Sequence, residues 1–449
     1  MTMKRNFSLT LILAIMIFGI MTVQGKTWSL EECIQYAMDN NISLRKAGLT
    51  RQTNEETLLE SKAVLFPSLS FTTNQNVAYN PWRAYGTSTV TGSQVESSTS
   101  RTSYNGTYSI GANWTVWNGN RNLNTIKQND LLTQKAEQDS VAQARAIEEQ
   151  ITTLYIQILY SKEAVNVNKE SLEAAKVNEQ RGLQMVQVGS MSKAECSQLS
   201  ATRAQDEYKV VQAESTVLGY KRQLKALLEI IDDDDFDVAD TESADAMALQ
   251  PIPSLQSVYG AAKANRPEIK RAQLAVQSAE LQQKIARGRY YPTVSLSASA
   301  GTSSASLNTN SWGEQVKSNF SVGAGVTVSV PIFDQRSSRT AVNKANIQRQ
   351  SAILDVQNED VTLHNTIEKY WIDANSNQNQ YKAAKVSTTA AQDSYELLSE
   401  QFAVGLKNIV ELQEGKTRLL SAKQSELQSK YMTILDLFRE QQPTLSRLP

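Results

Sequence analysis

Two patterns of apolar and polar residues alternate along the chain, and the pattern with the shorter period predicts β-strands. In the first half, apolar side chains alternate with small polar ones from Leu69 to Tyr79 and from Tyr104 to Val116. In the second half, the alternation runs from Val294 to Ala300 and from Phe320 to Val330. Each segment is about the ~9–11 residues that a tilted strand needs to cross a bilayer. One apolar face opposite a small polar face is typical of a membrane barrel with a water-filled lumen.

Aromatic residues gather at both ends of these predicted strands, as in the girdles of membrane barrels. One group comprises Tyr79, Trp82, Tyr85 and Tyr104, and the other comprises Phe66, Trp117, Tyr290, Tyr291 and Phe333. The alternative is a soluble antiparallel sandwich, which would have to cover these rings. That alternative explains neither the small number of strands nor the long helical segments of the chain.

The pattern with the longer period predicts helices of unusual length. Neither glycine nor proline occurs from Asn120 to Arg181 or from Ile332 to Val404. Helices filling these segments would be ~93 Å and ~110 Å long. Apolar residues recur with the three- and four-residue spacing of a coiled coil, in three sets. The sets are Ile151, Leu154, Ile158, Val165 and Leu172; Val210, Ala213, Val217, Tyr220, Leu224, Leu227 and Ile231; and Leu420, Leu427, Tyr431, Ile434 and Phe438.

The chain is a tandem repeat, in which helical segments flank two strands in each copy. The segment 29–47 matches 254–272, and Phe66-Pro67 matches Tyr291-Pro292, both at an offset of 225 residues. The pair Val188-Gly189 matches Val404-Gly405 at an offset of 216, so the second copy should have shorter loops. We therefore expect five parts: a signal peptide (1–25), the first repeat (26–230), an acidic linker (231–253), the second repeat (254–440) and a tail (441–449).

The first residues have the composition of a secretory signal peptide. Lys4 and Arg5 precede an apolar stretch from Leu9 to Met21, which is too short to span a bilayer. Removing these two cations from the 45 basic residues, against 46 acidic ones, leaves a net charge of −3. A nearly neutral exported chain is a poor candidate for binding nucleic acid.

Few residues suited to catalysis or metal binding are present. The chain has two cysteines and one histidine, which makes a zinc, haem or cysteine–histidine site improbable. Cys33 and Cys196 align with Val258 and Leu412 of the other repeat, so we expect both in the core, although a disulfide between them is possible. His364 is expected to be a surface or packed side chain, and Asp232–Asp235 a solvated link. We therefore expect no enzyme and no cofactor.

Four strands cannot close a barrel alone, because an open edge in lipid leaves backbone groups unsatisfied. Two chains would give eight strands, and a barrel of about eight is filled by its own side chains. Three chains would give twelve strands and room for a channel. The predicted fold is therefore mainly α-helical with a membrane β-barrel part: a trimer would form a 12-stranded barrel, continued by a tunnel of coiled-coil helices.

Several segments are similar to those of one protein family. The opening segment from Trp28 to Asn41 resembles the start of the outer-membrane efflux protein (TolC) family, and the segments 66–69 and 330–334 are also similar. The resemblance implies a trimer in the bacterial outer membrane with helices extending into the periplasm. It also implies a passive export duct of a tripartite efflux or type I secretion system, whose partners are outer-membrane lipid, a periplasmic adaptor protein and an inner-membrane pump.

The resemblance also implies roles for residues near two helix-hairpin turns. It assigns the turns Val188-Gly189-Ser190 and Val404-Gly405-Leu406 to adaptor contact. It assigns Glu411 and Glu414 to a carboxylate gate, in which neighbouring charges would raise one another's proton affinity. It pairs Lys407 with Glu195 in a latch, within or between protomers, where Phe402 replaces a tyrosine and lacks its hydroxyl. The alternative for the two glutamates is an ordinary solvated helix face.

A second function from another class is a non-conducting outer-membrane scaffold or adhesin that projects long coiled coils. The small polar residues on one face of the predicted strands favour the duct, because a simple anchor would fill its barrel with side chains. Ion conductance in planar bilayers distinguishes the two.

Overall fold

The computed structural model describes residues 27–82, 86–90, 93–97, 101–231, 236–240, 244–306, 308 and 310–441. The expected signal peptide, the aspartates 232–235 and residues 442–449 of the expected tail lie outside this range. The described chain is mainly helical, with one four-stranded sheet. It forms two compact units, and each unit contains parts of both sequence repeats. One is a sheet unit (47–140 and 267–360), and the other is a helical unit (residues up to 46, 141–266 and from 361 on).

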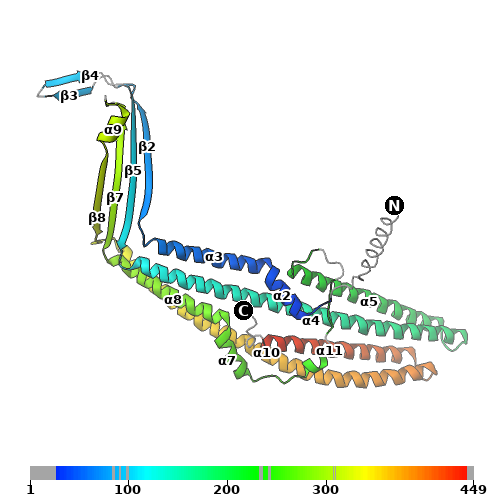
Figure 1. Ribbon diagram of the computed structural model, residues 1–449. Coiled ribbons are helices and arrows are strands. Elements are labelled where there is room, and N and C mark those ends of the chain that lie inside the picture. The colour runs from blue at the N-terminus through cyan, green and yellow to red at the C-terminus, as the bar shows by residue number, and fades with distance from the viewer. Residues whose placement is uncertain are drawn as a thin grey trace, which may run out of the picture. The chain divides into compact units, whose positions relative to one another are not determined.

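The sheet has the order β2 (Ser68–Tyr79), β5 (Thr102–Trp117), β7 (Thr293–Ala305) and β8 (Ser321–Ser329), and every pair is antiparallel (Figure 1). The register places apolar residues beside apolar ones: Ala112 pairs with Ala298, which pairs with Ala324. Because side chains alternate between faces, one face of the whole sheet is apolar. The four predicted strands and their apolar face are therefore present, and β2 and β8 are the edges of the described sheet.

The ends of these strands carry elements that the alternating pattern did not predict. A two-stranded ribbon of β3 (Gly86–Val90) and β4 (Ser93–Ser97) lies between β2 and β5 in the chain, and α9 (Trp312–Ser318) lies between β7 and β8. A capping box formed by Ser311 and Glu314 begins α9. The buried side chain of Gln315 accepts from the backbone N–H of Ala305 at 2.7 Å, which joins α9 to the end of β7.

The turns from strand to helix show the repeat most clearly. Gly119 and Asn120 after β5 and Gln335 and Arg336 after β8 all have positive φ, between 54° and 69°. These positions are related by the 216-residue offset, whereas the residues just before the strands are related by the offset of 225. The nine residues that the second repeat lacks therefore lie in its strand hairpin. In each turn a side chain caps the next helix: Asn118 Oδ1 accepts from Asn122 N at 3.2 Å, and Asp334 Oδ2 accepts from Ser338 N at 2.7 Å.

Long helices follow these turns. They are α4 (Arg121–Gln187) and α10 (Ser337–Ala403), each of 67 residues, or ~100 Å. The shorter helices α5 (Lys193–Leu227) and α11 (Ile409–Gln441) follow them, and α2 (Leu30–Asn40), α3 (Ile42–Ala63), α7 (Leu255–Asn265) and α8 (Pro267–Arg287) precede the strands. The predicted stripes are buried at Ile151, Ile158, Val165 and Leu172. Ile231 is a wrong assignment: α5 ends at Leu227 and Ile231 is exposed.

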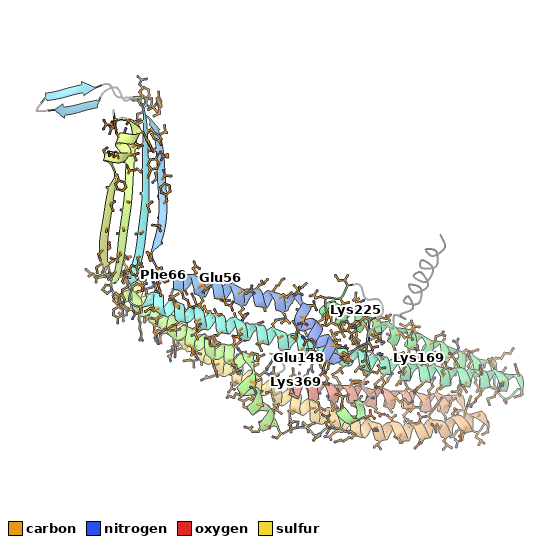
Figure 2. The ribbon with its side chains drawn as sticks, viewed as in Figure 1. Glu56, Phe66, Glu148, Lys169, Lys225 and Lys369 are labelled. Atoms are coloured by element: carbon orange, nitrogen blue, oxygen red, sulfur yellow. The ribbon has the colours of Figure 1, made fainter. Side chains whose placement is uncertain are left out.

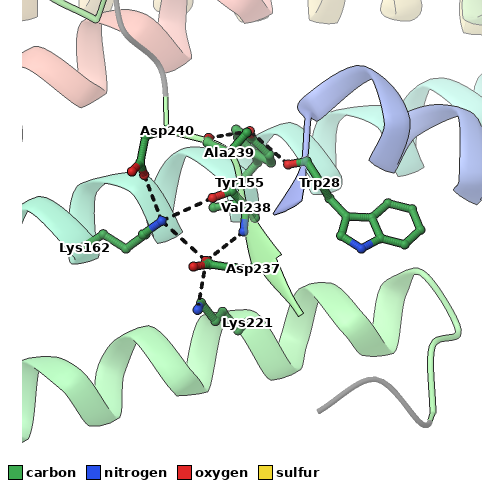
Figure 3. A network of polar contacts seen from close by, with 8 residues as sticks. All are labelled: Trp28, Tyr155, Lys162, Lys221, Asp237, Val238, Ala239 and Asp240. Carbon is green, nitrogen blue, oxygen red and sulfur yellow. Dashed lines mark hydrogen bonds and ion pairs between the residues drawn. The ribbon is translucent and has the colours of Figure 1, made fainter. Parts of the chain in front are cut away.

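The linker between the repeats is held in the helical unit by polar contacts (Figure 3). The short strand β1 (Thr27–Trp28) pairs in parallel with β6 (Asp237–Val238). Asp237 accepts from Lys221 at 2.9 Å and lies 3.4 Å from Lys162. Burial raises the pKa of Asp237, but the hydrogen bond from Lys221 and the nearby Lys162 outweigh this effect and lower it. This part of the linker is therefore fixed, while the solvated link expected at Asp232–Asp235 lies outside the described residues.

Beside this strand pair, the Tyr155 hydroxyl lies 2.8 Å from Ala239 O and 3.3 Å from Trp28 O. Burial, with the nearby Cys33 and Asp240, raises the pKa of Tyr155 to about 12, so its hydroxyl remains a neutral donor at physiological pH. The Tyr155 side chain thus joins α4 to both β1 and the linker.

The cysteines and the histidine occupy the places expected of them. Cys33 and Cys196 are free and buried, in line with the apolar residues at the matching positions of the other repeat. His364 is partly exposed, stacks edge-on against Tyr259 at 4.9 Å and lies 3.8 Å from Glu368. Among the described residues, no group of three or more potential metal ligands occurs.

Candidate functional site: the tips of the two helix hairpins

The helical unit contains two hairpins, α4–α5 and α10–α11, and each hairpin has a short turn at its tip (Figure 1). The turns have the same geometry. Gly189 and Gly405 both have φ of +77°. Ser190 N donates to Met185 O at 2.9 Å, and Leu406 N donates to Gln401 O at 2.9 Å. Each helix therefore ends in a Schellman motif, in which a left-handed glycine satisfies the last carbonyls.

The helices that leave the two turns also begin alike. In the first hairpin, Ser192 Oγ accepts from Glu195 N at 3.2 Å, and the Glu195 carboxylate accepts from Ser192 N at 2.9 Å. In the second, Asn408 Oδ1 accepts from Glu411 N at 3.0 Å, and the Glu411 carboxylate accepts from Asn408 N at 3.3 Å. Both are capping boxes, at positions related by the repeat offset. Glu195 and Glu411 are therefore helix caps, a role that our reading of the sequence missed.

The expected latch does not form within one chain. Lys407 Nζ donates to Glu411, four residues away, at 2.5 Å. Glu195 instead accepts hydrogen bonds at its own cap, and these lower its pKa. Side chains three or four positions apart on a helix are already close to each other. An ion pair or cap between them requires no ordering of another segment, so it forms in preference to a contact with a remote residue. A contact between Lys407 and Glu195 of neighbouring protomers stays a prediction.

The third predicted latch residue is part of an apolar core. Phe402 is 1% exposed and packs in a cluster that also contains Tyr395, Ile409 and Leu412. The cluster includes Leu199 of the first hairpin, so it joins both hairpins of the chain. An apolar ring suits this position, because a tyrosine hydroxyl buried here would need a polar partner.

The two predicted gate residues differ in their surroundings. The hydrogen bond from Lys407 and that from Asn408 N lower the pKa of Glu411. Within one chain, the nearest charge to Glu411 is thus a cation, and the mutual effect of carboxylates from three protomers stays a prediction. Glu414 is exposed and has no ion pair within the described residues. It lines a groove between α10 and α11 with Ala384, Val410 and Arg418.

A buried ion pair joins the two hairpins farther along the helices from the tip, and the sequence pattern did not predict it. Asp206 of α5 and Lys416 of α11 form a hydrogen-bonded pair, and their side chains are 5% and 11% exposed. Lys209 lies 3.3 Å from Asp206, and Ser171 Oγ of α4 donates to it at 3.1 Å. Burial raises the pKa of Asp206, but the hydrogen bonds from Lys416 and Lys209 outweigh burial and lower it. Burial lowers the pKa of Lys416 despite the same pair.

Further hydrogen bonds join the hairpins between this pair and the tip. Asn178 Nδ2 of α4 donates to the Tyr395 hydroxyl of α10 at 3.2 Å. Gln413 Nε2 of α11 donates to Thr202 Oγ1 of α5 at 2.8 Å. The two hairpins are therefore fastened along α4–α10 and along α5–α11. The sequence does carry a sign that Asp206 and Lys416 are buried. They lie seven residues after Leu199 and four after Leu412, where the helical period places apolar residues.

Packing inside each hairpin depends on a glycine that faces a leucine. A Cβ added to Gly182 of α4 would lie 2.5 Å from Leu199 Cδ1 of α5. A Cβ added to Gly415 of α11 would lie 2.6 Å from Leu398 Cδ1 of α10. The repeat offset places Leu398 at the position of Gly182, and Gly415 at the position of Leu199. The two repeats therefore use the same contact with the small and the large residue exchanged between helices.

Comparison with known proteins gives similarities to one class of membrane protein. Residues 258–435 match the family model "Outer membrane efflux protein". This match, which lies within the second repeat, agrees with the family that the sequence resembles and with the expected location in the outer membrane, with helices in the periplasm. The family consists of channels rather than enzymes. No helix in the described ranges is both long and apolar enough to span a bilayer.

Several solved structures are similar to this chain in fold. The structure of CusC has a TM-score of 0.77 with 16% identity, covering 92% of this chain and 91% of that one. VceC from Vibrio cholerae has a TM-score of 0.75 with 16% identity, covering 92% and 95%. The CmeC outer membrane channel of Campylobacter jejuni has a TM-score of 0.74 with 19% identity, covering 92% and 85%. At these identities the likeness establishes the fold. The search of curated proteins gave no match.

Proposed function

We propose that this chain is one protomer of a trimeric, passive export duct of the outer membrane. It would serve a tripartite efflux or type I secretion system, with an adaptor and an inner-membrane pump engaging its hairpin tips. The observation that carries the proposal is the sheet: four strands with an apolar face and two edges, β2 and β8, that no other described strand covers.

Such a sheet is unstable in lipid as a single chain, because edge N–H and C=O groups find no water in the hydrocarbon core. Pairing of β8 with β2 of a second chain removes an edge from each protomer. Three copies then close twelve strands, which leave a lumen, whereas two copies would close eight, which side chains fill. The small polar residues opposite the apolar face support the larger, water-filled barrel.

The helices also present apolar residues that need partners. Ile347, Leu354 and Val361 of α10 are exposed and lie seven residues apart, which is the spacing of a coiled-coil seam. On α5, Tyr208, Val211 and Leu218 are exposed as well. Stripes of this kind support an assembly in which neighbouring protomers cover them.

Crosslinking between edge strands tests the assembly. Cys33 and Cys196 are first replaced by alanine, and single cysteines are then placed along β2 and along β8. We expect pairs such as Phe71→Cys with Val326→Cys, scanned over neighbouring positions, to give disulfide-linked dimers and trimers. Matched pairs that combine β2 with the central strand β7 should give none. Absence of intermolecular bonds at every β2–β8 position would contradict a closed barrel.

The turns at Val188–Ser190 and Val404–Leu406 are proposed as the adaptor contacts. Their side chains are exposed, and Val188, Val404 and Leu406 offer apolar area at the tip. Lys407 and Glu195 are proposed to pair between protomers and to hold the tip closed. Lys407→Glu should then increase the uptake of large antibiotics more than Lys407→Gln does, because only the former introduces repulsion. If both variants are expressed normally and have the same antibiotic susceptibility as the wild type, this latch is refuted.

The gate is proposed to depend on Glu414 more than on Glu411. Glu411 is engaged by Lys407 and its cap, whereas Glu414 is exposed beside the groove. Three protomers would place a ring of carboxylates around the passage, which favours cations. Reconstituted Glu414→Gln channels should lose more cation selectivity than Glu411→Gln channels, and the double variant should lose both selectivity and block by multivalent cations. A double variant that keeps its cation preference would show that both residues belong to an ordinary solvated helix face.

A further inference from the structure

One edge of the sheet gathers basic residues. The connections to β2 and β7 and from β5 and β8 all lie at this edge, because Ser68 pairs with Asn113, and Thr293 with Ser329. Across residues 60–67, 117–121, 284–292 and 331–339 there are seven basic and two acidic side chains. The four strands themselves contain no charged residue. A positively charged border therefore adjoins a charge-free sheet.

Four of the arginines form what we call the arginine patch. Arg287 and Arg289 precede β7, and Arg336 and Arg339 follow β8, so the β7–β8 pairing places the two groups at neighbouring strand ends. All four side chains are exposed, and none has an ion pair or side-chain hydrogen bond within the described residues. The nearby Asp334 carboxylate accepts a hydrogen bond from Ser338 N, and its contacts with Ser338 lower its pKa. Asp334 therefore stays charged and is engaged at the start of α10.

The helices that begin at this edge carry cations in their first turns, although the carboxylate of Asp334 caps α10. The first turns of α4 and α10 contain no acidic residue. Instead α4 begins with Arg121, and Arg339 lies in the first turn of α10. At the hairpin tips, by contrast, the first turns of α5 and α11 contain Glu195 and Glu411. Cations at a helix N-terminus oppose the macrodipole, so arginines here add to a positive potential rather than cancel one.

Exposed aromatic and aliphatic residues lie beside the patch. Tyr290, Tyr291, Ile332 and Phe333 are all at least half exposed, and Phe66 at the base of β2 is exposed as well (Figure 2). Rings at this depth are typical of the boundary between hydrocarbon and headgroups. Guanidinium groups beside them would lie at the level of lipid phosphates, which they bind bidentately.

We propose that the arginine patch binds the headgroups of anionic phospholipids at the periplasmic surface of the outer membrane. This inference rests on the proposed barrel, whose strands place the patch at the membrane boundary. Each basic residue near an anionic bilayer surface strengthens binding about fivefold, so four per protomer should produce a clear preference over zwitterionic lipid.

The test uses the full-length protein in detergent, titrated with short-chain phosphatidylglycerol, short-chain phosphatidylcholine or inorganic phosphate, with binding followed by native mass spectrometry. We expect saturable binding of phosphatidylglycerol, at least tenfold weaker binding of phosphatidylcholine and no comparable binding of phosphate. Replacement of the four arginines by glutamine should weaken phosphatidylglycerol binding at least tenfold. The corresponding lysine variant should retain most of it.

A matched control replaces four exposed cations of the helical unit by glutamine, namely Lys193, Arg222, Lys369 and Arg418, and should leave lipid binding unchanged. Equal binding of both lipids, phosphate binding as tight as that of the lipid, or full binding by the glutamine variant would overturn the proposal. Oligomeric state and conductance of the wild-type protein test the barrel separately, so a failed lipid preference in a conducting trimer refutes the patch alone.

Discussion

Replacement of Lys416 by methionine should destabilise the hairpin tips by removing one member of a buried ion pair. The Asp206 carboxylate is 5% exposed and would lose its closest cation. Removing one partner of a buried pair costs about 3–5 kcal/mol. Because Lys209 remains 3.3 Å away and Ser171 3.1 Å away, we expect the lower end, about 3 kcal/mol.

The assay is thermal unfolding of the detergent-solubilised protein, followed by far-ultraviolet circular dichroism. At about 2–4 °C per kcal/mol for chains of 150–250 residues, the midpoint should fall by about 6–12 °C. The double variant Asp206→Leu with Lys416→Met leaves no buried charge and should recover most of this loss, because apolar pairs often replace buried ion pairs at no cost. A single variant as stable as the wild type, or a double variant as unstable as the single one, would refute this account of the pair.

Three further outcomes are expected. Gly182→Leu should lower the thermal midpoint because of the clash with Leu199, and adding Leu199→Gly, which copies the second repeat, should restore it; an unchanged single variant would contradict the packing. Tyr155→Phe should cost about 1–2 kcal/mol and speed proteolytic cleavage within residues 231–253, whereas equal cleavage rates would show that the hydroxyl does not hold the linker. Since the pKa of Glu411 is lowered in the fold, its cap stabilises the protein above the ordinary glutamate pKa and fades as pH falls through the lowered value. Glu411→Gln should therefore remove part of the acid sensitivity of the melting temperature, and an unchanged pH profile would count against the cap.

The strands and long helices were predictable because their patterns are local and periodic. Alternation between Ala112 and its polar neighbours assigns faces before any pairing is known, and the register then joins apolar faces. The absence of glycine and proline from Asn120 to Arg181 and from Ile332 to Val404 likewise predicts two long helices. Chain repeats helped further, since Cys196 could be assigned to the core from Leu412 of the other copy.

Other features depend on partners that sequence spacing alone does not identify. Asp206 and Lys416 are 210 residues apart, so only the packing of two hairpins brings them together. The β1–β6 pair is two residues long, too short for any period to show. The capping boxes were visible as Ser192–Glu195 and Asn408–Glu411, but the family resemblance directed attention to the charges of Glu195 and Glu411 as latch and gate. Local capping competes with those roles for the same carboxylates.

Single-channel recording in planar bilayers tests the central claim most directly, using the purified full-length protein at defined salt. A trimeric export duct predicts discrete, cation-preferring conductance steps from a species that sizes as a trimer. A protein that remains monomeric in detergent, or a trimer that inserts without conducting, would contradict the duct and favour a non-conducting scaffold.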